Sequence, residues 1–241
     1  MYLYLYAPFL RAKKYARDLA LLEGRITDFG IAGKIAQLSQ FLKLPAAVKE
    51  FGMKKLDTVV VVGDDTLLDD TVNLFALSNV VVAYIPMVES EYGGALHIPE
   101  GIAAADVLAA RRIAKLDLGR VGERFFLGSL HCEGKTLEIH SPTFSVFSQS
   151  YISVDLVNLG EGVYPDQGAL TARITPVEGS MFKKSQGVQS VLKLQSCRLK
   201  SGKPLSAKIG AQGVLKLPLQ VDSSPKAIRM VVGRRVRKMK N

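Results

Sequence analysis

The sequence predicts an α/β protein, with an N-terminal three-layer α/β domain built on a mostly parallel sheet and then an antiparallel β-sandwich-like domain. Residues 1–118 alternate apolar, strand-like runs with stretches of helical periodicity. Residues 119–241 consist of short alternating runs separated by Gly, Pro, Ser and Asn. The composition changes between about residues 115 and 125. We therefore place an α/β domain at 1–118 and a β-rich C-terminal domain at 119–241.

The elements of the first part follow from apolar periodicity and from residues that stop helices. "YLYLYA" alternates and is aromatic, which favours a strand, and four consecutive valines are typical of a buried parallel strand. The expected elements are a strand at 2–7, a helix at 11–30 ending at Gly30, a helical stretch at 33–53 broken near Pro45, a strand at 59–62, a helix at 68–77, a strand at 80–86 and a helix at 102–113.

The second part reads as strands only, because each apolar run is short, alternates and ends at a turn-forming residue. The expected strands are 124–130, 136–141, 153–159, 169–177, 190–200, 213–221 and 227–233.

Cysteine content and hydropathy bear on where the protein works. Cys132 and Cys197 are too few and too far apart for a disulfide framework or a zinc cluster, so we expect reduced thiols and an intracellular protein. The apolar region 72–88 is broken by polar residues and by Pro86, so we do not expect it to span a membrane. The predicted location is the cytoplasm, with peripheral association with a membrane as a variant.

The charge is concentrated at one end of the sequence. The formal net charge is +10 and the pI is near 9.6. Residues 180–241 contain fifteen Lys or Arg and one acid, and so carry +14 against about −4 for the rest. This predicts an anionic partner, namely a phospholipid surface, nucleic acid or a polyphosphate, although lysines on strands also discourage edge aggregation. Phe182 is the only aromatic residue after Ser180, which disfavours nucleic acid because stacking platforms are not evident.

The most informative stretch is "VVVVGDDTLLDDTVN", residues 59–73, where an apolar strand runs into a glycine and then a helix. In α/β folds this type of turn faces ligands, because ligands bind beyond the carboxyl ends of the strands. The stretch resembles the nucleotide loop of the diacylglycerol kinase catalytic domain, a lipid-kinase family that shares its fold with NAD kinases. The family pattern is roughly VVVGGDGTLNEVVN, and an ungapped match sets Gly63 on its first Gly, Asp65 on its Asp and Asn73 on its final Asn.

The resemblance continues in order along most of the chain. "VVVAYIPM" and "HIPEGIAAADVL" resemble the next strand and helix of the family, and "AKLDLGRVGERFFL" resembles its hinge into the second domain. "SVDLVNLG", "QGALTARI" and "LPLQVDSSPKAIRMVV" resemble the later strands. The resemblance implies an ATP-dependent lipid kinase that uses Mg²⁺. The nucleotide-binding positions that it implies are Gly63, Asp64, Asp65, Thr66 and Asn73.

Four functional motifs of the family are altered in this chain. In the nucleotide loop, Asp64 and Thr66 replace glycines that let backbone N–H groups approach phosphate, and Leu67 replaces a hydroxyl. "VESEY" at 88–92 replaces the family's GTGND motif, and "APFLR" at 7–11 replaces its NP.SG turn. Gly210, Ala211 and Gln212 stand where the family carries DGE, whose acid is thought to deprotonate the lipid hydroxyl, and Gln cannot act as a base.

Because phosphoryl transfer depends on positioning and on cations at the phosphates, these changes predict a non-catalytic or atypical protein that binds a lipid, a nucleotide or a protein partner. No catalytic residue is assigned. The alternatives are an active lipid kinase with an unusual nucleotide loop and a nucleic-acid binder that uses the basic C-terminal domain.

Two interpretations of the acids near this turn remain open. In the first, the acids gather at the ends of two neighbouring strands and bind Mg²⁺ or Ca²⁺ through oxygens. In the second, Asp69 and Asp70 are charges in the first turn of a helix, where the helix dipole favours them. The acids concerned are Asp64, Asp65, Asp69, Asp70, Glu89 and Glu91.

Overall fold

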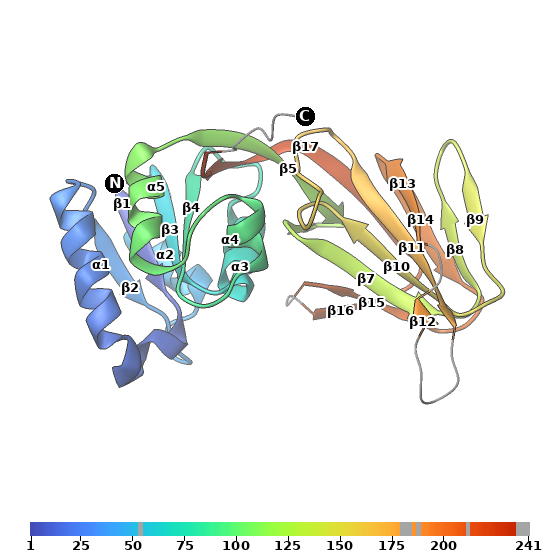
Figure 1. Ribbon diagram of the computed structural model, residues 1–241, viewed down its shortest axis with the longest axis horizontal. Helices are drawn as coiled ribbons and strands as arrows, with labels where there is room; N and C mark the ends of the chain where they lie inside the picture. The colour runs from blue at the N-terminus through green and yellow to red at the C-terminus, as the bar shows by residue number, and fades with distance from the viewer. Residues whose placement is uncertain (53–54, 179–184, 187–188, 211–212, 235–241) are drawn as a thin grey trace. The chain divides into compact units, whose positions relative to one another are not determined.

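The computed structural model describes residues 1–52, 55–178, 185–186, 189–210 and 213–234 (Figure 1). By their contacts these residues form two compact units. Unit 1 is Met1–Lys115 together with the chain from Ile228 onward, and unit 2 is Leu116–Ala227. The division into domains at 1–118 and 119–241 stays a prediction.

Unit 1 is built on a parallel sheet in the order β2-β1-β3-β4-β17. Every residue of β3 and β4 is buried, which explains why both strands are continuous apolar runs. The ranges are β1 (Tyr2–Tyr6), β2 (Lys34–Gln37), β3 (Thr58–Gly63), β4 (Val81–Pro86) and the end of β17 (Leu219–Val231).

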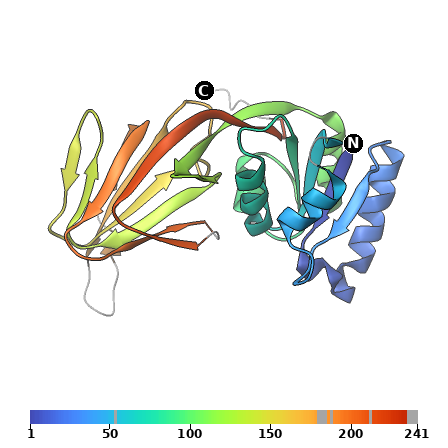
Figure 2. The ribbon, with the colours of Figure 1, turned by 180° about the vertical axis from the view of Figure 1, so that it is seen from behind.

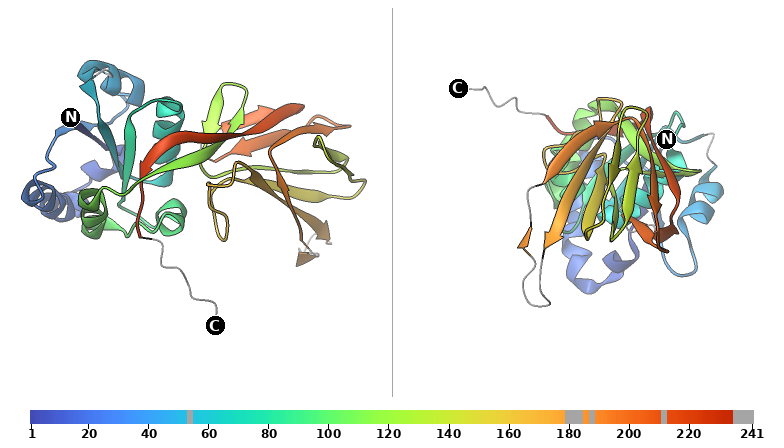
Figure 3. Two further views of the ribbon diagram at one scale, coloured as in Figure 1. Left: turned by 90° about the horizontal axis from the view of Figure 1, so that it is seen from above. Right: turned by 90° about the vertical axis from the view of Figure 1, so that its right-hand side faces the viewer.

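Helices cover both faces of this sheet. Figure 3 (left) shows α1 and α5 on one side of the parallel strands and α2 and α3 on the other. Right-handed crossovers require this, because the chain moves one way from β1 to β2 and the opposite way from β2 through β3 to β4. The ranges are α1 (Ala16–Asp28), α2 (Leu44–Phe51), α3 (Asp65–Phe75), α4 (Glu91–Ala95) and α5 (Ala104–Ala110), with 3₁₀ turns η1 (Pro8–Arg11), η2 (Lys13–Tyr15) and η4 (Gly101–Ala103).

The helical stretch predicted at 33–53 is partly wrong, because its first part is the edge strand β2 and only α2 is helical. β2 pairs with β1 from Leu3–Lys34 to Tyr6–Gln37. Gly33 lets the chain enter this pairing, since a Cβ at Gly33 would lie 2.5 Å from the carbonyl oxygen of Tyr2. Four residues on an exposed edge carry too short a pattern to reveal a strand, and the pairing overrides the helical periodicity.

The helix predicted at 68–77 begins three residues earlier, at Asp65. Asp69 therefore lies in the second turn and is buried, with 2% of its surface exposed. The interpretation of Asp69 and Asp70 as first-turn charges is wrong, and Asp65 is the acid in the first turn.

Unit 2 contains a fully antiparallel sheet in the order β12-β11-β10-β7-β15-β16, with β13 also beside β11. A second group of strands, β17-β14-β8-β9 with β5 and β6, is antiparallel as well (Figure 2). The ranges are β5 (Ile113–Val121), β6 (Arg124–Phe126), β7 (Ser129–Gly134), β8 (Leu137–His140), β9 (Ser145–Phe147), β10 (Ile152–Val157), β11 (Leu170–Glu178), β12 (Ser185–Gln186), β13 (Ser190–Leu194), β14 (Ser196–Ser201), β15 (Ser206–Ile209) and β16 (Gly213–Lys216).

One hydrophobic core joins the two groups of strands in unit 2. Leu130, Val154 and Ile209 come from the first group, and Leu199 and Val221 come from the second. The run predicted as a single strand at 190–200 is two strands, because β13 pairs in one group and β14 in the other. Both cysteines are free and buried in this core.

The predicted fold class is confirmed: a mostly parallel α/β unit and a separate antiparallel β unit. Among the helices of the described residues, each is too short or too polar to cross a bilayer.

Candidate functional site

The turn after β3 starts at Gly63, which is buried and packs against the end of β1. A Cβ at Gly63 would lie 2.6 Å from the Cβ of Ala7. The backbone of Gly63 is also fixed, since its carbonyl accepts a hydrogen bond from the N–H of Met87 at 2.8 Å. The absence of a side chain at Gly63 therefore serves the packing of β1 against β3.

Asp64 is the N-cap of α3. Its backbone is extended, and its carboxylate oxygen Oδ1 accepts a hydrogen bond from the N–H of Leu67 at 3.0 Å. Asp is among the best residues at this position, because it satisfies a free N–H and its charge suits the positive end of the helix. The Asp that replaces a family glycine thus stabilises its own helix.

Asp65 connects the turn after β3 with the segment after β4. Its Oδ1 accepts hydrogen bonds from Tyr84 Oη at 2.9 Å and from Ser90 Oγ. Its Oδ2 accepts from the backbone N–H groups of Glu91 at 3.0 Å and Tyr92 at 3.4 Å. These N–H groups belong to the first turn of α4. The Asp65 carboxylate therefore has four donors from within the protein, two of them at a helix N-terminus.

The same segment makes a second set of contacts. Ser90 caps α4, accepting a hydrogen bond from the N–H of Gly93 at 2.7 Å, and the Tyr92 hydroxyl donates to Asp69 Oδ2 at 3.0 Å. Burial raises the pKa of Tyr84 with a further contribution from the charge of Asp65, against a lowering by Ser90, and burial with the charge of Asp69 raises the pKa of Tyr92. Both tyrosines therefore stay protonated as donors. We call Gly63–Asp69 together with Tyr84 and Ser90–Gly93 the sealed turn.

A nucleotide at this turn would need free N–H donors for its phosphates. In the sealed turn, the N–H groups of Leu67, Glu91, Tyr92 and Gly93 already bind Asp64, Asp65 or Ser90. Two of these acceptors are carboxylates, which take the place that an external anion would take. In this arrangement these four N–H groups are therefore not available to a phosphate.

The five implied nucleotide-binding residues are only partly brought together. Gly63, Asp64, Asp65 and Thr66 are consecutive, and Thr66 is exposed in the first turn of α3. Asn73 lies farther along the same helix, about 12 Å from Asp65 at the usual helical rise. Their role in binding a nucleotide stays a prediction.

The acids near the turn either accept hydrogen bonds from the protein or face solvent. Within the described ranges, no group of three or more His, Cys, Asp or Glu side chains is arranged to hold a metal ion. Asp64, Asp65 and Asp69 accept hydrogen bonds, while Glu89 and Glu91 are exposed. Partial burial of the carboxyl and the charge of Asp64 raise the pKa of Asp70. The magnesium or calcium interpretation stays a prediction.

The position of a catalytic base is only partly described. Gly210 lies in the turn after β15, and Ala211 and Gln212 lie outside the described residues. The side chain that would replace the family's acid therefore has no structural account.

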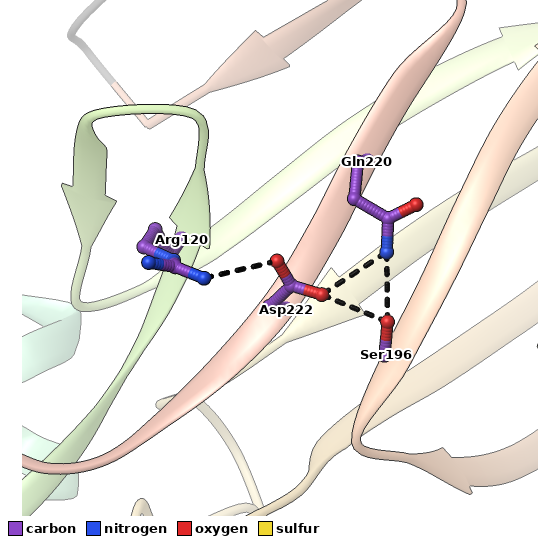
Figure 4. Close-up of polar contacts among 4 residues, drawn as sticks. All are labelled: Arg120, Ser196, Gln220 and Asp222. Carbon is purple, nitrogen blue, oxygen red and sulfur yellow. Dashed lines mark hydrogen bonds and ion pairs between the residues drawn. The ribbon is translucent and has the colours of Figure 1, made fainter.

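Unit 2 contains a polar cluster that links three strands (Figure 4). Ser196 Oγ donates to Asp222 Oδ1 at 2.8 Å, Gln220 Nε2 donates to both, and Arg120 forms an ion pair with Asp222 at 3.3 Å. Burial alone raises the pKa of Asp222, but the hydrogen bonds from Gln220, Ser196 and Arg120 outweigh it and lower that pKa. The cluster fastens β5, β14 and β17 to each other, which is a structural role.

The sequence reasoning missed Tyr84, Ser90 and Tyr92, which complete the sealed turn. A signal for Ser90 was present, because Ser followed by Glu before a short helix is typical of an N-cap. No local signal marks Tyr84, whose hydroxyl reaches Asp65 only because β3 and β4 are neighbours in register.

Solved structures share this fold. A diacylglycerol kinase from Bacillus anthracis strain Sterne matches with a TM-score of 0.77 and 16% identity, covering 96% of each chain. Two further structures from the same organism, assigned as diacylglycerol kinases, match with a TM-score of 0.76 and 15% identity, covering 96% of this chain and 96–97% of theirs. No protein-family model and no curated protein matches the sequence. The chain therefore has the fold of diacylglycerol kinase-like lipid kinases, as the resemblance predicts.

Proposed function

We propose that this protein is a non-phosphorylating protein with a lipid-kinase fold, and that it acts by binding a lipid surface. One observation carries the first part of the proposal. The carboxylate of Asp64 accepts from the N–H of Leu67 in the first turn of α3, and the carboxylate of Asp65 accepts from the N–H groups of Glu91 and Tyr92 in the first turn of α4, where a kinase of this fold would present donors to ATP phosphates.

The energetics favour the internal carboxylates over an external phosphate. A hydrogen bond to a charged group contributes about 1.5–3 kcal/mol, and Asp65 accepts four hydrogen bonds. ATP would have to displace these bonds and would place its own negative charges beside two carboxylates, which adds repulsion. Because the carboxylates are covalently part of the turn, they also bind without the entropy cost of association.

Lipid is the ligand class that the fold and the charge support. The solved structures that share the fold are diacylglycerol kinases or are assigned as such. The net charge of +10 suits an anionic surface, and it is a poor match for a neutral or cationic partner.

The test is titration calorimetry with ATP, with and without Mg²⁺, using a Bacillus anthracis diacylglycerol kinase as the parallel positive sample. We expect no saturable heat at millimolar ATP. We also expect no transfer of labelled phosphate to diacylglycerol in mixed micelles. Saturable ATP binding that disappears in Asp65→Asn, with the variant still folded by circular dichroism, would overturn the proposal. It would favour an active lipid kinase with an unusual loop.

A further inference from the structure

The strands of the parallel sheet in unit 1 all end at the same side of the sheet. The sealed turn follows β3 and β4 there, and the segments after β1 and β2 lie at the rest of that side. The two segments lie side by side, since the N–H of Leu38 donates to the carbonyl of Tyr6 at 3.0 Å and Gln37 Nε2 donates to the carbonyl of Ala7 at 3.0 Å. Figure 1 shows both at the lower end of unit 1. Neither segment takes part in the sealed turn.

Phe41 lies at the tip of the segment after β2 and is 87% exposed. Its turn is held in place, because Ser39 Oγ accepts hydrogen bonds from the N–H groups of Phe41 at 3.2 Å and Leu42 at 3.1 Å. The N–H of Ser39 in turn donates to the carbonyl of Leu42 at 3.1 Å. An ordered turn thus exposes a large aromatic side chain to solvent. This exposure is unfavourable in free energy, and no packing of the ring within unit 1 offsets it.

Four cations lie on the segment after β1: Arg11, Lys13, Lys14 and Arg17, all exposed. They form no ion pair with any residue that the structure describes. Their position before and within the first turn of α1 is unfavourable for the helix dipole, and that helix has no side-chain cap. Lys14 lies over the ring of Tyr15, 4.8 Å from its centre, and the charges of the other three cations do not favour the helix beside them. We call Arg11, Lys13, Lys14, Arg17 and Phe41 the basic edge.

We propose that the basic edge docks on the surface of an anionic phospholipid bilayer, with Phe41 entering the interface and the four cations facing the headgroups. This inference rests on the proposed function and names the surface that the protein uses. Aromatic side chains partition to the membrane interface, and each Lys or Arg near an anionic surface adds attraction. A single protruding aromatic side chain beside aliphatic Leu42 and Leu44 suits a bilayer better than the stacked bases of a nucleic acid.

The chain contains no Trp, so Phe41→Trp places a single tryptophan at the proposed contact, and its emission can be excited apart from that of the tyrosines. The matched control is Phe147→Trp, because Phe147 is 66% exposed and lies in unit 2. We expect a blue shift of Phe41→Trp emission with vesicles that contain phosphatidylglycerol. We expect none with pure phosphatidylcholine vesicles, and none for Phe147→Trp with either.

Vesicle co-sedimentation then measures each contribution. Phe41→Ser should weaken binding roughly tenfold, the usual effect of losing one buried aromatic side chain. Replacement of the four cations by Ala should weaken it roughly a hundredfold or more, and salt should have the same effect on the wild type. The control removes four exposed cations of unit 2 instead, and it should weaken binding much less: Lys135, Lys203, Lys208 and Lys216.

Several outcomes would overturn the inference. A blue shift in Phe147→Trp with no shift in Phe41→Trp would place the contact in unit 2. An equal blue shift of Phe41→Trp with duplex DNA would identify a nucleic-acid surface. ATP binding in calorimetry would overturn the proposed lack of catalysis. A vesicle-dependent shift of Phe41→Trp emission would still support docking, so failure of the proposed function can be told apart from failure of the docking proposal.

Discussion

The two halves of one sheet edge differ in where their charges find partners. In the sealed turn, Asp64, Asp65 and Asp69 are each bound by donors of the same unit. In the basic edge, the cations have no carboxylate partner among the described residues, Lys14 contacts only the ring of Tyr15, and Phe41 is exposed. The difference teaches that charged groups at the ends of neighbouring strands can either form hydrogen bonds within the fold or stay exposed to solvent, where an external partner can bind them. Only the second kind predicts a binding surface.

The largest effect should come from breaking the sealed turn. Asp65→Ala leaves the Tyr84 and Ser90 hydroxyls and two N–H groups without their acceptor, so we expect a loss of about 3–4 kcal/mol in the free energy of unfolding. Urea denaturation measures it. The control is Asp70→Asn on the same helix, which should be neutral or slightly stabilising, because the fold already disfavours the charged form of Asp70. Equal losses in both variants would contradict the assignment.

The next effect concerns Gly63. A methyl group there meets the Cβ of Ala7, so Gly63→Ala should lower stability by about 1–3 kcal/mol. Thermal unfolding of the double variant Ala7→Gly/Gly63→Ala should recover part of that loss, because the clashing atom is removed. If Gly63 instead served only to admit a phosphate, the single variant would be as stable as the wild type.

A third prediction concerns pH. The pKa of Tyr92 is raised in the folded state, so above about pH 10 the unfolded chain releases this proton while the folded protein keeps it. The free energy of unfolding should therefore fall as the pH rises through that range. Tyr92→Phe should cost about 1 kcal/mol at neutral pH and make the alkaline loss less steep, as denaturation at several pH values will report. An unchanged slope in the variant would contradict the role given to the Tyr92 hydroxyl.

The smallest effect should come from the basic edge and should have the opposite sign. Arg17→Glu places an acid in the first turn of α1, so we expect a gain of about 0.3–1 kcal/mol in stability. Arg17→Ala should give a smaller gain. A clear loss of stability in both variants, measured by thermal unfolding, would show that Arg17 has an internal structural partner.

The sequence predicts the parts of the fold that depend on local pattern. Strands β3 and β4 are apparent because both faces are buried and each residue is apolar. Edge strand β2 is missed because only Ala36 of its four residues is buried. The start of α3 is missed because the resemblance assigns Asp64 and Asp65 to a ligand loop, although an Asp before an apolar run is also a helix cap.

The candidate site is harder to predict, because its contacts span distant segments. Asp65 meets Tyr84 and Ser90 across separations of 19 and 25 residues. Only the register of β3 against β4 brings these side chains together. The resemblance to a lipid kinase draws attention to the turn after β3, but it does not reveal that Asp65 accepts hydrogen bonds from the segment after β4.

Strand β17 has a consequence for biosynthesis. Its end pairs with β4 through Arg229–Val81 and Met230–Val82, so β4 acquires one neighbour only after all of unit 2 has been made. While the chain emerges from the ribosome, the apolar strand β4 has an open edge, which is the kind of surface that recruits foreign strands. Nascent chains that stall within unit 2 should therefore depend on chaperones more than the finished protein does.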